Sequence, residues 1–226
     1  MSVGRPRLAV FCRAPRPGRT KTRLIPGLGE AGAAAFSIAL LLDLAARLDA
    51  PGWDRELWVA DERDRGPIGA LAGDARVRVQ TGADLGERML SCIAAGAEAG
   101  RPATVIVGSD CPGIDPETVE AALLALDDAD AVICPSGDGG YGLVAARRAL
   151  PALFAGIDWG TPKVCEQTRT AAMRTGIRLA EPCAVDDVDR PDDLARLAGD
   201  LAARANPTAL GRTRAILGTV DGVSPD

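Results

Sequence analysis

Asp110 is the residue whose surroundings in the sequence are most informative about chemistry. The run ATVIVGSDCPG places it after a short apolar stretch, residues 103–107, with Gly108 and Ser109 as the turn. An apolar stretch of this length bounded by Gly and Pro is typical of a buried parallel strand. Ligands of open α/β sheets bind beyond the carboxyl ends of such strands. The sequence therefore predicts a carboxylate at a substrate crevice, where a divalent metal could hold phosphates.

A second acidic run, VDDVDRPDDL at 185–194, precedes a predicted helix. Helix capping and a favourable first-turn charge explain its later aspartates, but they explain Asp187 less well. Magnesium typically takes one or two protein carboxylates together with substrate phosphates. We expect Asp110 to share a Mg²⁺ (or Mn²⁺) ion with Asp187 or Asp189.

The run RAPRPGRTKTR at 13–23, called the basic loop below, places five cations in eleven residues directly after the first predicted strand. Arginine forks and a lysine charge suit phosphate oxygens, and a glycine lets backbone approach a ligand. The Walker pattern GxxxxGK[ST] is absent. The alternative is a solvated basic loop. Six residues are predicted to bind nucleotide here: Arg13, Pro15, Gly18, Arg19, Lys21 and Arg23.

The run QTGADLGERM at 80–89 offers two further candidates for nucleotide binding. Gln80 at a strand end could hydrogen-bond a base, and Arg88 could reach a phosphate. The alternative is an ordinary helix start with surface charge.

The run PSGDGGYG at 135–142 joins two predicted strands. Asp-Gly-Gly is an ordinary turn signal. It could also form a tight loop that lets an acceptor approach the backbone. In that interpretation Asp138, Gly139 and Gly140 line the acceptor site and Tyr141 forms its wall.

The chain has 226 residues and contains no histidine. That excludes Ser-His-Asp hydrolysis, Cys-His catalysis and His-ligated zinc. Chemistry must then depend on carboxylates, Lys, Arg, Tyr, backbone amides and a bound metal. Phosphoryl and nucleotidyl transfer fit this inventory, because they depend mainly on positioning and charge neutralisation.

The net charge and the composition limit the classes of molecule that the protein is expected to bind. The net charge of −5 and the pI near 4.9 argue against a nucleic-acid partner. Six cysteines without a CxxC pattern do not indicate a disulfide framework. We expect neither a membrane span nor a signal peptide, and hence a cytoplasmic protein that binds small molecules. The oligomeric state stays open, with a homodimer as one option.

The elements that must position these residues alternate along the chain. This alternation predicts an α/β fold with a mostly parallel sheet and right-handed crossovers. We expect one transferase-sized domain over 1–205 and a loosely ordered tail over 206–226. The expected strands are 7–12, 56–60, 76–80, 103–107, 131–135, 141–146 and 177–180. The expected helices are 30–48, 84–99, one beginning at Asp115-Pro116, 161–175 and 191–205.

Taken together, the runs resemble a known bacterial group. FCRAPRPGRTKTRL, GADLGERM, GSDCPG, DGGYG, LFAGIDW and DDVDRPDDL occur in the order typical of the DUF2064 family, between about residues 7 and 197. Its members are glycosyltransferase-like, or CofC-like, relatives of 2-phospholactate guanylyltransferase. The resemblance implies a GT-A-type nucleotide-diphospho-sugar transferase fold, a three-layer α/β/α arrangement with a mixed, mostly parallel sheet.

The same resemblance implies roles for single residues. The basic loop would hold nucleotide phosphates, and Asp110 would hold the metal with Asp187 or Asp189 as a second ligand. The acceptor would lie near the glycines of DGGYG and Tyr141.

We expect a metal-dependent nucleotidyltransferase in which Asp110, Lys21 and Arg23 are catalytic. A phosphate or carboxylate oxygen of a small acceptor would attack the α-phosphorus of an NTP, and pyrophosphate would leave. Such acceptors are ionised at neutral pH, so the reaction needs no general base. Two alternatives remain: glycosyl transfer from a nucleotide-sugar, and a non-catalytic nucleotide-binding module.

Overall fold

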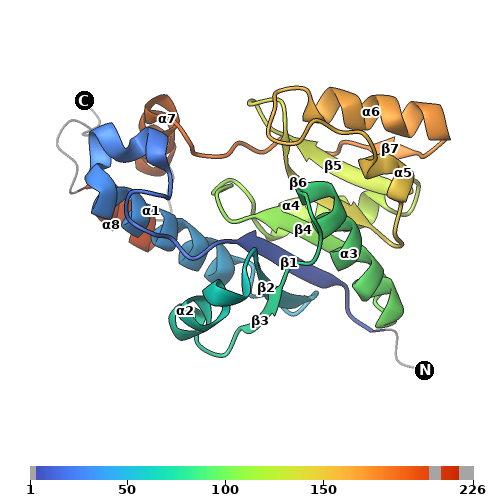
Figure 1. Ribbon diagram of the computed structural model, residues 1–226, viewed down its shortest axis with the longest axis horizontal. Coiled ribbons are helices and arrows are strands. Elements are labelled where there is room, and N and C mark those ends of the chain that lie inside the picture. Colours follow the sequence, from blue (N-terminus) through green and yellow to red (C-terminus); the bar gives the residue numbers. More distant parts are fainter. Residues whose placement is uncertain (1–3, 204–209, 219–226) are drawn as a thin grey trace.

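Seven strands form one sheet in the order β3-β2-β1-β4-β6-β5-β7 (Figure 1). The structure is a computed structural model that describes residues 4–203 and 210–218. Strand β6 runs antiparallel to its neighbours β4 and β5, and the other pairs are parallel. The predicted mixed, mostly parallel sheet is therefore confirmed. The strands are β1 (Arg7–Cys12), β2 (Asp54–Val59), β3 (Arg76–Val79), β4 (Thr104–Gly108), β5 (Ala131–Pro135), β6 (Tyr141–Ala146) and β7 (Leu179–Ala180).

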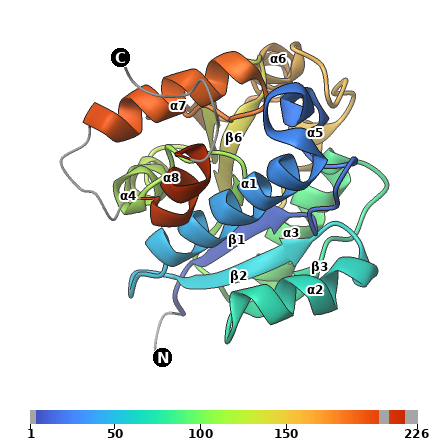
Figure 2. The same ribbon diagram turned by 90° about the vertical axis from the view of Figure 1, so that its left-hand side faces the viewer.

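Helices cover both faces of the sheet, which confirms the three-layer α/β/α arrangement (Figure 2). One face carries α1 (Ile25–Arg47), α2 (Glu62–Ala72) and α4 (Pro116–Ala125). The other carries α3 (Leu85–Glu98), α5 (Pro151–Phe154) and α6 (Val164–Thr175). Helices α7 (Pro191–Ala203) and α8 (Gly211–Leu217), with the 3₁₀ turn η1 (Thr22–Leu24), share a third apolar cluster with α1.

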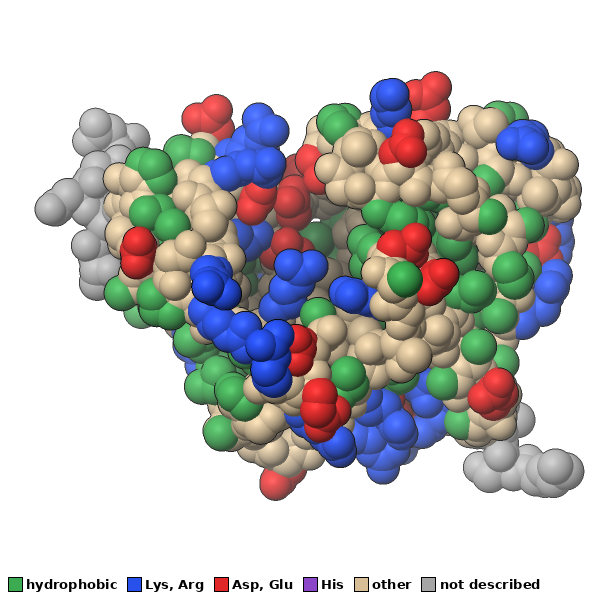
Figure 3. Space-filling model, in the orientation of Figure 1, with side chains coloured by type: hydrophobic (Ala, Val, Ile, Leu, Met, Phe, Trp, Pro, Cys, Tyr) green, Lys and Arg blue, Asp and Glu red, His purple; other side chains and the backbone are tan. Residues whose placement is uncertain are grey.

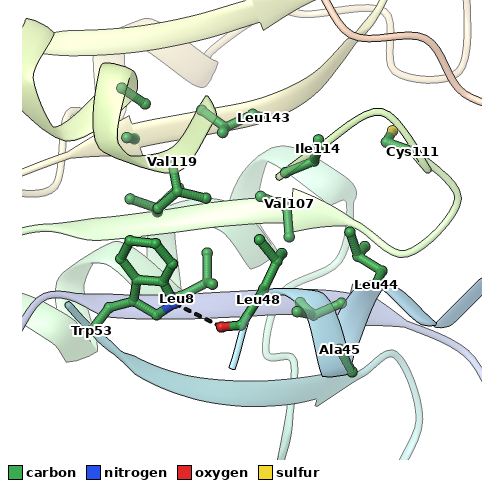
Figure 4. Packing of buried hydrophobic residues seen from close by; sticks show 14 of the residues in the cluster. Leu8, Leu44, Ala45, Leu48, Trp53, Val107, Cys111, Ile114, Val119 and Leu143 are labelled. Atoms are coloured by element: carbon green, nitrogen blue, oxygen red, sulfur yellow. Dashed lines mark hydrogen bonds between the residues drawn. The ribbon is translucent and has the colours of Figure 1, made fainter. Parts of the chain in front are cut away.

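Alternation along the strands explains why both faces are covered. In β1, Leu8 and Val10 belong to the cluster under α1 and α4, whereas Ala9 belongs to the cluster under α3. This is the two-residue period of a strand buried on both sides. Figure 4 shows Leu8 packed among side chains of α1 and α4, where the Trp53 indole donates to the carbonyl oxygen of Leu48 at 2.9 Å.

Two helix starts follow from capping residues visible in the sequence. The Asp84 carboxylate accepts from the backbone N–H of Glu87 at the start of α3, and Asp115 accepts from that of Thr118 at the start of α4. Pro116 is the first residue of α4, where its missing N–H costs nothing. Both predicted starts are confirmed within one residue.

Helix α2 was not predicted. Its sequence ERDRGPIGALA contains two glycines and a proline, which lower helix propensity and resemble a loop. The helix is held by its N-terminal cap and one anchor: Asp61 caps its first turn, and Ile68 is fully buried against the sheet. Tertiary burial therefore overrides weak propensity.

Element boundaries differ elsewhere by a few residues. Helix α1 begins at Ile25 rather than 30, and it contains a kink at Gly29, whose φ is +68°. Helix α6 begins at 164 rather than 161 because Thr161 closes a turn, donating its hydroxyl to the carbonyl oxygen of Asp158.

The C-terminal segment contains a packed helix where we expected loose structure. Leu210 precedes α8 and Leu217 is its last residue, and each is 5% exposed. The buried Asp43 carboxylate of α1 accepts from the backbone N–H of Thr213 at 2.8 Å and from the guanidinium of Arg212 at 3.1 Å. The expectation of a loose tail is therefore wrong for residues 210–218. Residues 204–209 and 219–226 lie outside the described part of the chain.

The stretch Thr22–Arg47 is long and apolar enough to cross a membrane by length and composition alone. It is the one such stretch in the described residues. Its Phe36, Leu40 and Leu44 are nevertheless buried against neighbouring elements. Its apolar residues thus contribute to the core of the fold.

Candidate active site

The basic loop and the Asp110 turn begin at neighbouring strand ends. Strands β1 and β4 pair in parallel, with Phe11 opposite Gly108, and the backbone N–H of Ser109 donates to the carbonyl oxygen of Phe11 at 3.1 Å. The chain builds β2 and β3 on one side of β1 and places β4 on the other. The two loops therefore leave the sheet where its strand order reverses, the usual ligand site of an open α/β sheet.

A cavity of about 890 Å³ opens at this edge, within the usual range for ligand sites. Figure 3 shows the molecule hollowed between the region of α7 and that of α6, with acidic side chains inside and basic ones on the rim. The charged residues that line the cavity are Arg23, Asp110, Asp138, Asp186, Asp187, Asp189, Arg190, Asp193 and Arg196.

Lys21 links the basic loop to both acidic runs. Its ammonium lies 3.1 Å from Oδ2 of Asp110 and 3.7 Å from Oδ1 of Asp189, and its side chain is only 8% exposed. Its backbone is left-handed, with φ 48° and ψ 48°, which is uncommon for a residue with a side chain. Burial alone would lower the Lys21 pKa, but attraction by Asp110 and Asp189 holds that pKa above its usual value.

The acidic run reaches the Asp110 turn through backbone hydrogen bonds. The N–H of Val185 donates to the carbonyl oxygen of Pro135 at the end of β5, and the N–H of Val188 donates to that of Asp110 at 3.0 Å. These bonds place Asp187 at the cavity. Burial, then repulsion by the Asp110 carboxylate, raises the pKa of Asp187 to about 6. The three carboxylates predicted to converge therefore line one cavity.

The cations of the basic loop divide into paired and unpaired groups. Arg23 forms an ion pair with Asp189, and Arg16 pairs with the buried Asp64 of α2. Arg13 and Arg19 are exposed and have no ion-pair partner among residues 4–203 and 210–218. Of the predicted nucleotide-binding residues in this loop, Arg23 lines the cavity directly, and Lys21 borders it through its carboxylate partners.

The donor set at the cavity suits a hard divalent cation. Aspartates outnumber arginines on its wall, so a polyphosphate would need added positive charge there. The Asp110 side chain is 43% exposed, and Asp187 is crowded by like charge. Within the described residues, no three His, Cys, Asp or Glu side chains form a ready-made metal cluster. Asp110 with Asp187 or Asp189 fits a Mg²⁺ ion that takes its remaining ligands from phosphate and water.

The Asp-Gly-Gly turn lies at the same cavity, but its residues have local structural tasks. Asp138 Oδ1 accepts from the hydroxyl of Ser136 at 2.7 Å and from the N–H of Gly140 at 2.9 Å. Gly139 has φ +88°, and a Cβ there would lie 2.1 Å from the carbonyl oxygen of Pro162. The space beside Gly139 is thus filled by the chain itself, rather than left for an acceptor. Asp138, Gly140 and Tyr141 line the cavity.

Gln80 and Arg88 are not among the described residues that line the cavity. The Gln80 side-chain amide donates to the carbonyl oxygen of Trp58 at 2.7 Å, and Arg88 Nε donates to that of Gly82 at 3.1 Å. The Gln80 contact joins the end of β3 to β2 and the Arg88 contact joins α3 to the turn before it, so both favour structural tasks for these residues.

Trp159, Arg190 and Arg196 are among the cavity residues that the sequence interpretation missed. Trp159 meets Tyr141 edge-on at 6.4 Å between ring centroids, and Arg190 and Arg196 line the cavity from the start of α7. The scarcity of aromatic residues could have signalled Trp159, since only 3% of the chain is aromatic. The two arginines carried no signal beyond an ordinary charged helix.

Comparison with known proteins supports the family and the fold. The DUF2064 model, described as an uncharacterized protein conserved in bacteria, matches residues 43–161. A 3-phospho-D-glycerate guanylyltransferase of Phenylobacterium zucineum (strain HLK1) is 32% identical over 190 residues, which cover 79% of this chain and 84% of that protein. A 2-phospho-L-lactate guanylyltransferase of Methanopyrus kandleri is 34% identical over 94 residues, 39% of this chain and 46% of that protein.

A similar arrangement of elements is found in a crystal structure from Desulfovibrio desulfuricans G20. That protein, provisionally assigned as a nucleotide-diphospho-sugar transferase, superposes with a TM-score of 0.88 at 29% identity. The superposition covers 95% of this chain and 94% of that one.

Proposed function

We propose that this chain, which belongs to the DUF2064 family, moves a nucleoside monophosphate from an NTP to a small anionic acceptor and releases pyrophosphate. The chain is a transferase, as are its named relatives. The names of two relatives make GTP the first donor to test and a phosphorylated hydroxy acid the first acceptor class.

One observation carries the proposal: Lys21 contacts Asp110 and Asp189 at the edge of the cavity. A lysine from the loop after β1 and carboxylates from two distant segments meet at one point beside a crevice. Lysine and arginine suit phosphate oxygens, and the carboxylates suit a divalent metal. This combination serves nucleotidyl transfer, which depends on neutralising charge around the phosphates.

In the proposed reaction, Lys21 and Arg23 bind phosphate oxygens of the NTP and stabilise the negative charge that builds on the α-phosphate and the pyrophosphate. Both side chains now contact Asp189, so both are held near the place where a triphosphate would lie. An ionised acceptor oxygen attacks the α-phosphorus in line, the bond to the bridging oxygen breaks, and pyrophosphate leaves. The attacking oxygen carries no proton, so no residue must act as its base.

Asp110, with Asp187 or Asp189, would hold Mg²⁺ or Mn²⁺, which when bound supplies electrophilic assistance at the phosphates. Asp138 and Tyr141 line the cavity on the side of the β5–β6 turn. The acceptor is proposed to lie against this turn, with Tyr141 and Trp159 as its apolar wall.

Pyrophosphate release separates the proposed activity from its alternatives. The protein is incubated with each of the four NTPs, Mg²⁺ and either 3-phosphoglycerate or 2-phospholactate. The expected result is pyrophosphate, with GTP as the best donor, and a nucleotide-linked acceptor in equal amount. A parallel series with nucleotide-sugars tests glycosyl transfer.

Release of free NDP from a nucleotide-sugar, without pyrophosphate from any NTP, would favour glycosyl transfer. Tight nucleotide binding that EDTA does not change, without turnover of either donor, would favour a non-catalytic module.

A further inference from the structure

Asp64 is a buried carboxylate that the proposed mechanism does not use. It lies in the first turn of α2 and is 3% exposed. Its two oxygens have different partners, both in the basic loop. Oδ2 accepts from the backbone N–H of Ala14 at 3.0 Å, and Oδ1 accepts from Nη2 of Arg16 at 2.6 Å. The carboxylate therefore ties the start of the basic loop to a helix beyond the neighbouring strand.

A buried carboxylate is unfavourable unless hydrogen bonds and an opposite charge compensate it. Here both kinds of compensation come from the loop. One bond fixes backbone at Ala14 and the other fixes the Arg16 side chain. Pro15 between them has a restricted φ. Asp64 and Pro15 therefore together restrict the backbone of the first residues of the loop.

The constraint continues along the loop. The backbone N–H of Arg16 donates to the hydroxyl of Thr20 at 2.8 Å, and the N–H of Arg19 donates to the carbonyl oxygen of Arg16 at 3.0 Å. The backbone of Arg16 thus forms hydrogen bonds that turn the chain between residues 16 and 20. Lys21 follows at once, in its left-handed conformation beside Asp110.

Asp64 also determines which basic side chains of the loop are free to bind phosphate. It offsets the charge of Arg16, whose side chain is 45% exposed. Arg13 and Arg19 flank this pair, are exposed, and lack ion-pair partners in the described part of the chain. Anchoring Arg16 therefore leaves its neighbours presented to solvent on a fixed backbone.

We propose that Asp64 is a positioning residue for the polyphosphate of the donor nucleotide. It touches no ligand itself. It holds Ala14 and Arg16 so that the cations of the basic loop are arranged before the nucleotide binds. This inference rests on the proposed function, because it takes the basic loop as the phosphate-binding element.

Two variants of Asp64 separate its two contacts. Asp64→Ala removes both, whereas Asp64→Asn keeps an oxygen for the Ala14 amide and removes the charge opposite Arg16. Asp61→Ala is the matched control: the Asp61 carboxylate caps the same helix at the N–H of Arg63 and also accepts from the Arg63 guanidinium. Both Ala variants weaken the first turn of α2, but only Asp64→Ala removes hydrogen bonds to the basic loop.

Hydrogen exchange of the peptide covering residues 13–20, without nucleotide, gives the first readout. Exchange at Ala14 should accelerate about tenfold in Asp64→Ala, which loses a hydrogen bond to a charged group. It should stay at the wild-type rate in Asp61→Ala. This measurement does not require the protein to be a nucleotidyltransferase.

Steady-state kinetics gives the second readout. Asp64→Ala should raise KM for the NTP about tenfold and change kcat by less than about twofold. The reason is that the unanchored loop must be ordered when the NTP binds, which uses part of the binding energy. Asp64→Asn should fall between wild type and Asp64→Ala. Arg16→Ala should add little to Asp64→Ala, because the two residues act through one contact.

Each outcome bears on the proposal. A wild-type KM and exchange rate in Asp64→Ala would overturn it, as would an equal rise of KM in Asp61→Ala. If Asp64→Ala does not fold, Asp64→Asn decides by the same two measurements. If the chain transfers no nucleotide, faster exchange in Asp64→Ala still shows the anchor, and fluorescent-GTP affinity replaces KM. If Asp64→Ala then shows faster hydrogen exchange at Ala14 but binds fluorescent GTP as tightly as wild type, the positioning role is rejected.

Discussion

The ammonium of Lys21 and the carboxylate of Asp110 lie 3.1 Å apart, although 89 residues separate them in the chain. Asp189 joins the same ammonium at 3.7 Å. The carboxylates proposed to ligate a metal are thus already in contact with the cation proposed to bind phosphate. Two positive charges that share carboxylate oxygens compete for them. Lys21 should therefore oppose metal binding until a polyphosphate offers its ammonium another partner.

Replacing Lys21 by methionine tests this competition. Lys21→Met removes the charge and keeps much of the side-chain volume, so the affinity for Mn²⁺ without nucleotide should rise about tenfold or more. Turnover should fall, because the phosphates lose a cation. Titration calorimetry or the electron paramagnetic resonance of free Mn²⁺ measures the first effect. Arg19→Met, in the same loop but without an ion pair, should leave the affinity for Mn²⁺ unchanged. Weaker Mn²⁺ binding in Lys21→Met would contradict the competition.

Asp110→Asn tests the carboxylate itself. The amide is nearly isosteric but carries no charge, so turnover should fall by about three orders of magnitude if Asp110 holds the metal. The melting temperature should change little, because the side chain is 43% exposed. Asp127→Asn is the control: Asp127 is a surface carboxylate paired with Arg147, and it does not line the cavity. Wild-type turnover in Asp110→Asn would remove this residue from the mechanism.

The position of Asp110 could be predicted because it depends on local information. An apolar run followed by Gly-Ser marks a strand end, and parallel strand ends gather at one edge of a sheet. The same reasoning placed Lys21 and Arg23 after β1. Neither sequence run indicates that β1 and β4 are neighbouring strands. That adjacency follows from the strand order, which long-range packing decides.

The residues that escaped prediction depend on such long-range packing. Asp64 lies in a segment whose glycines and proline lower the predicted helix propensity. The sequence therefore gave no indication that Asp64 is a buried carboxylate. The role of Gly139 was misread for a related reason. A glycine in a turn signals that backbone approaches something closely, and only the fold shows that its neighbour is Pro162 of the same chain. Gln80 and Arg88 were likewise assigned without knowledge of the carbonyl oxygens to which their side chains donate.

Removing divalent metal should stop the reaction without unfolding the protein. Apolar clusters on both faces of the sheet hold the fold together, and none of the proposed ligands belongs to either cluster. EDTA should therefore abolish pyrophosphate release while leaving the circular dichroism spectrum unchanged, and Mg²⁺ or Mn²⁺ should restore activity. Undiminished turnover in excess EDTA would exclude the proposed role of the metal.

Gly139→Ala should destabilise the turn beside the cavity. Its new Cβ would lie 2.1 Å from the carbonyl oxygen of Pro162, on a backbone with φ +88°. The positive φ and the clash together should cost about 3 kcal/mol or more of unfolding free energy. Gly156→Ala separates the two causes, because Gly156 has φ +72° but nothing within 4 Å of the added Cβ. It should cost only about 1 kcal/mol. Equal losses in urea unfolding would show that Pro162 yields to the new methyl group.

Asp43 links the C-terminal helix to the core, and its removal should release that helix. The carboxylate is 5% exposed and accepts from the N–H of Thr213 and the guanidinium of Arg212, so it acts as the cap that α8 otherwise lacks. In Asp43→Ala the buried N–H of Thr213 loses its acceptor, whereas Arg212, which is 58% exposed, can turn to water. The expected loss is about 1–3 kcal/mol of unfolding free energy, typical of a cap combined with a charged hydrogen bond. Hydrogen exchange should accelerate over 211–217 and stay slow in β1 and β4.

Asp200, an exposed residue of α7, provides the control for Asp43. Asp200→Ala removes the same charge from the neighbouring helix without removing a buried acceptor, so exchange over 211–217 should not change. If Asp43→Ala also leaves that exchange slow, then α8 is held by its apolar contacts with α1 and α7. The buried leucines at both ends of α8 would in that case outweigh the cap. The comparison therefore decides whether polar capping or apolar burial fixes the C-terminal segment to the fold.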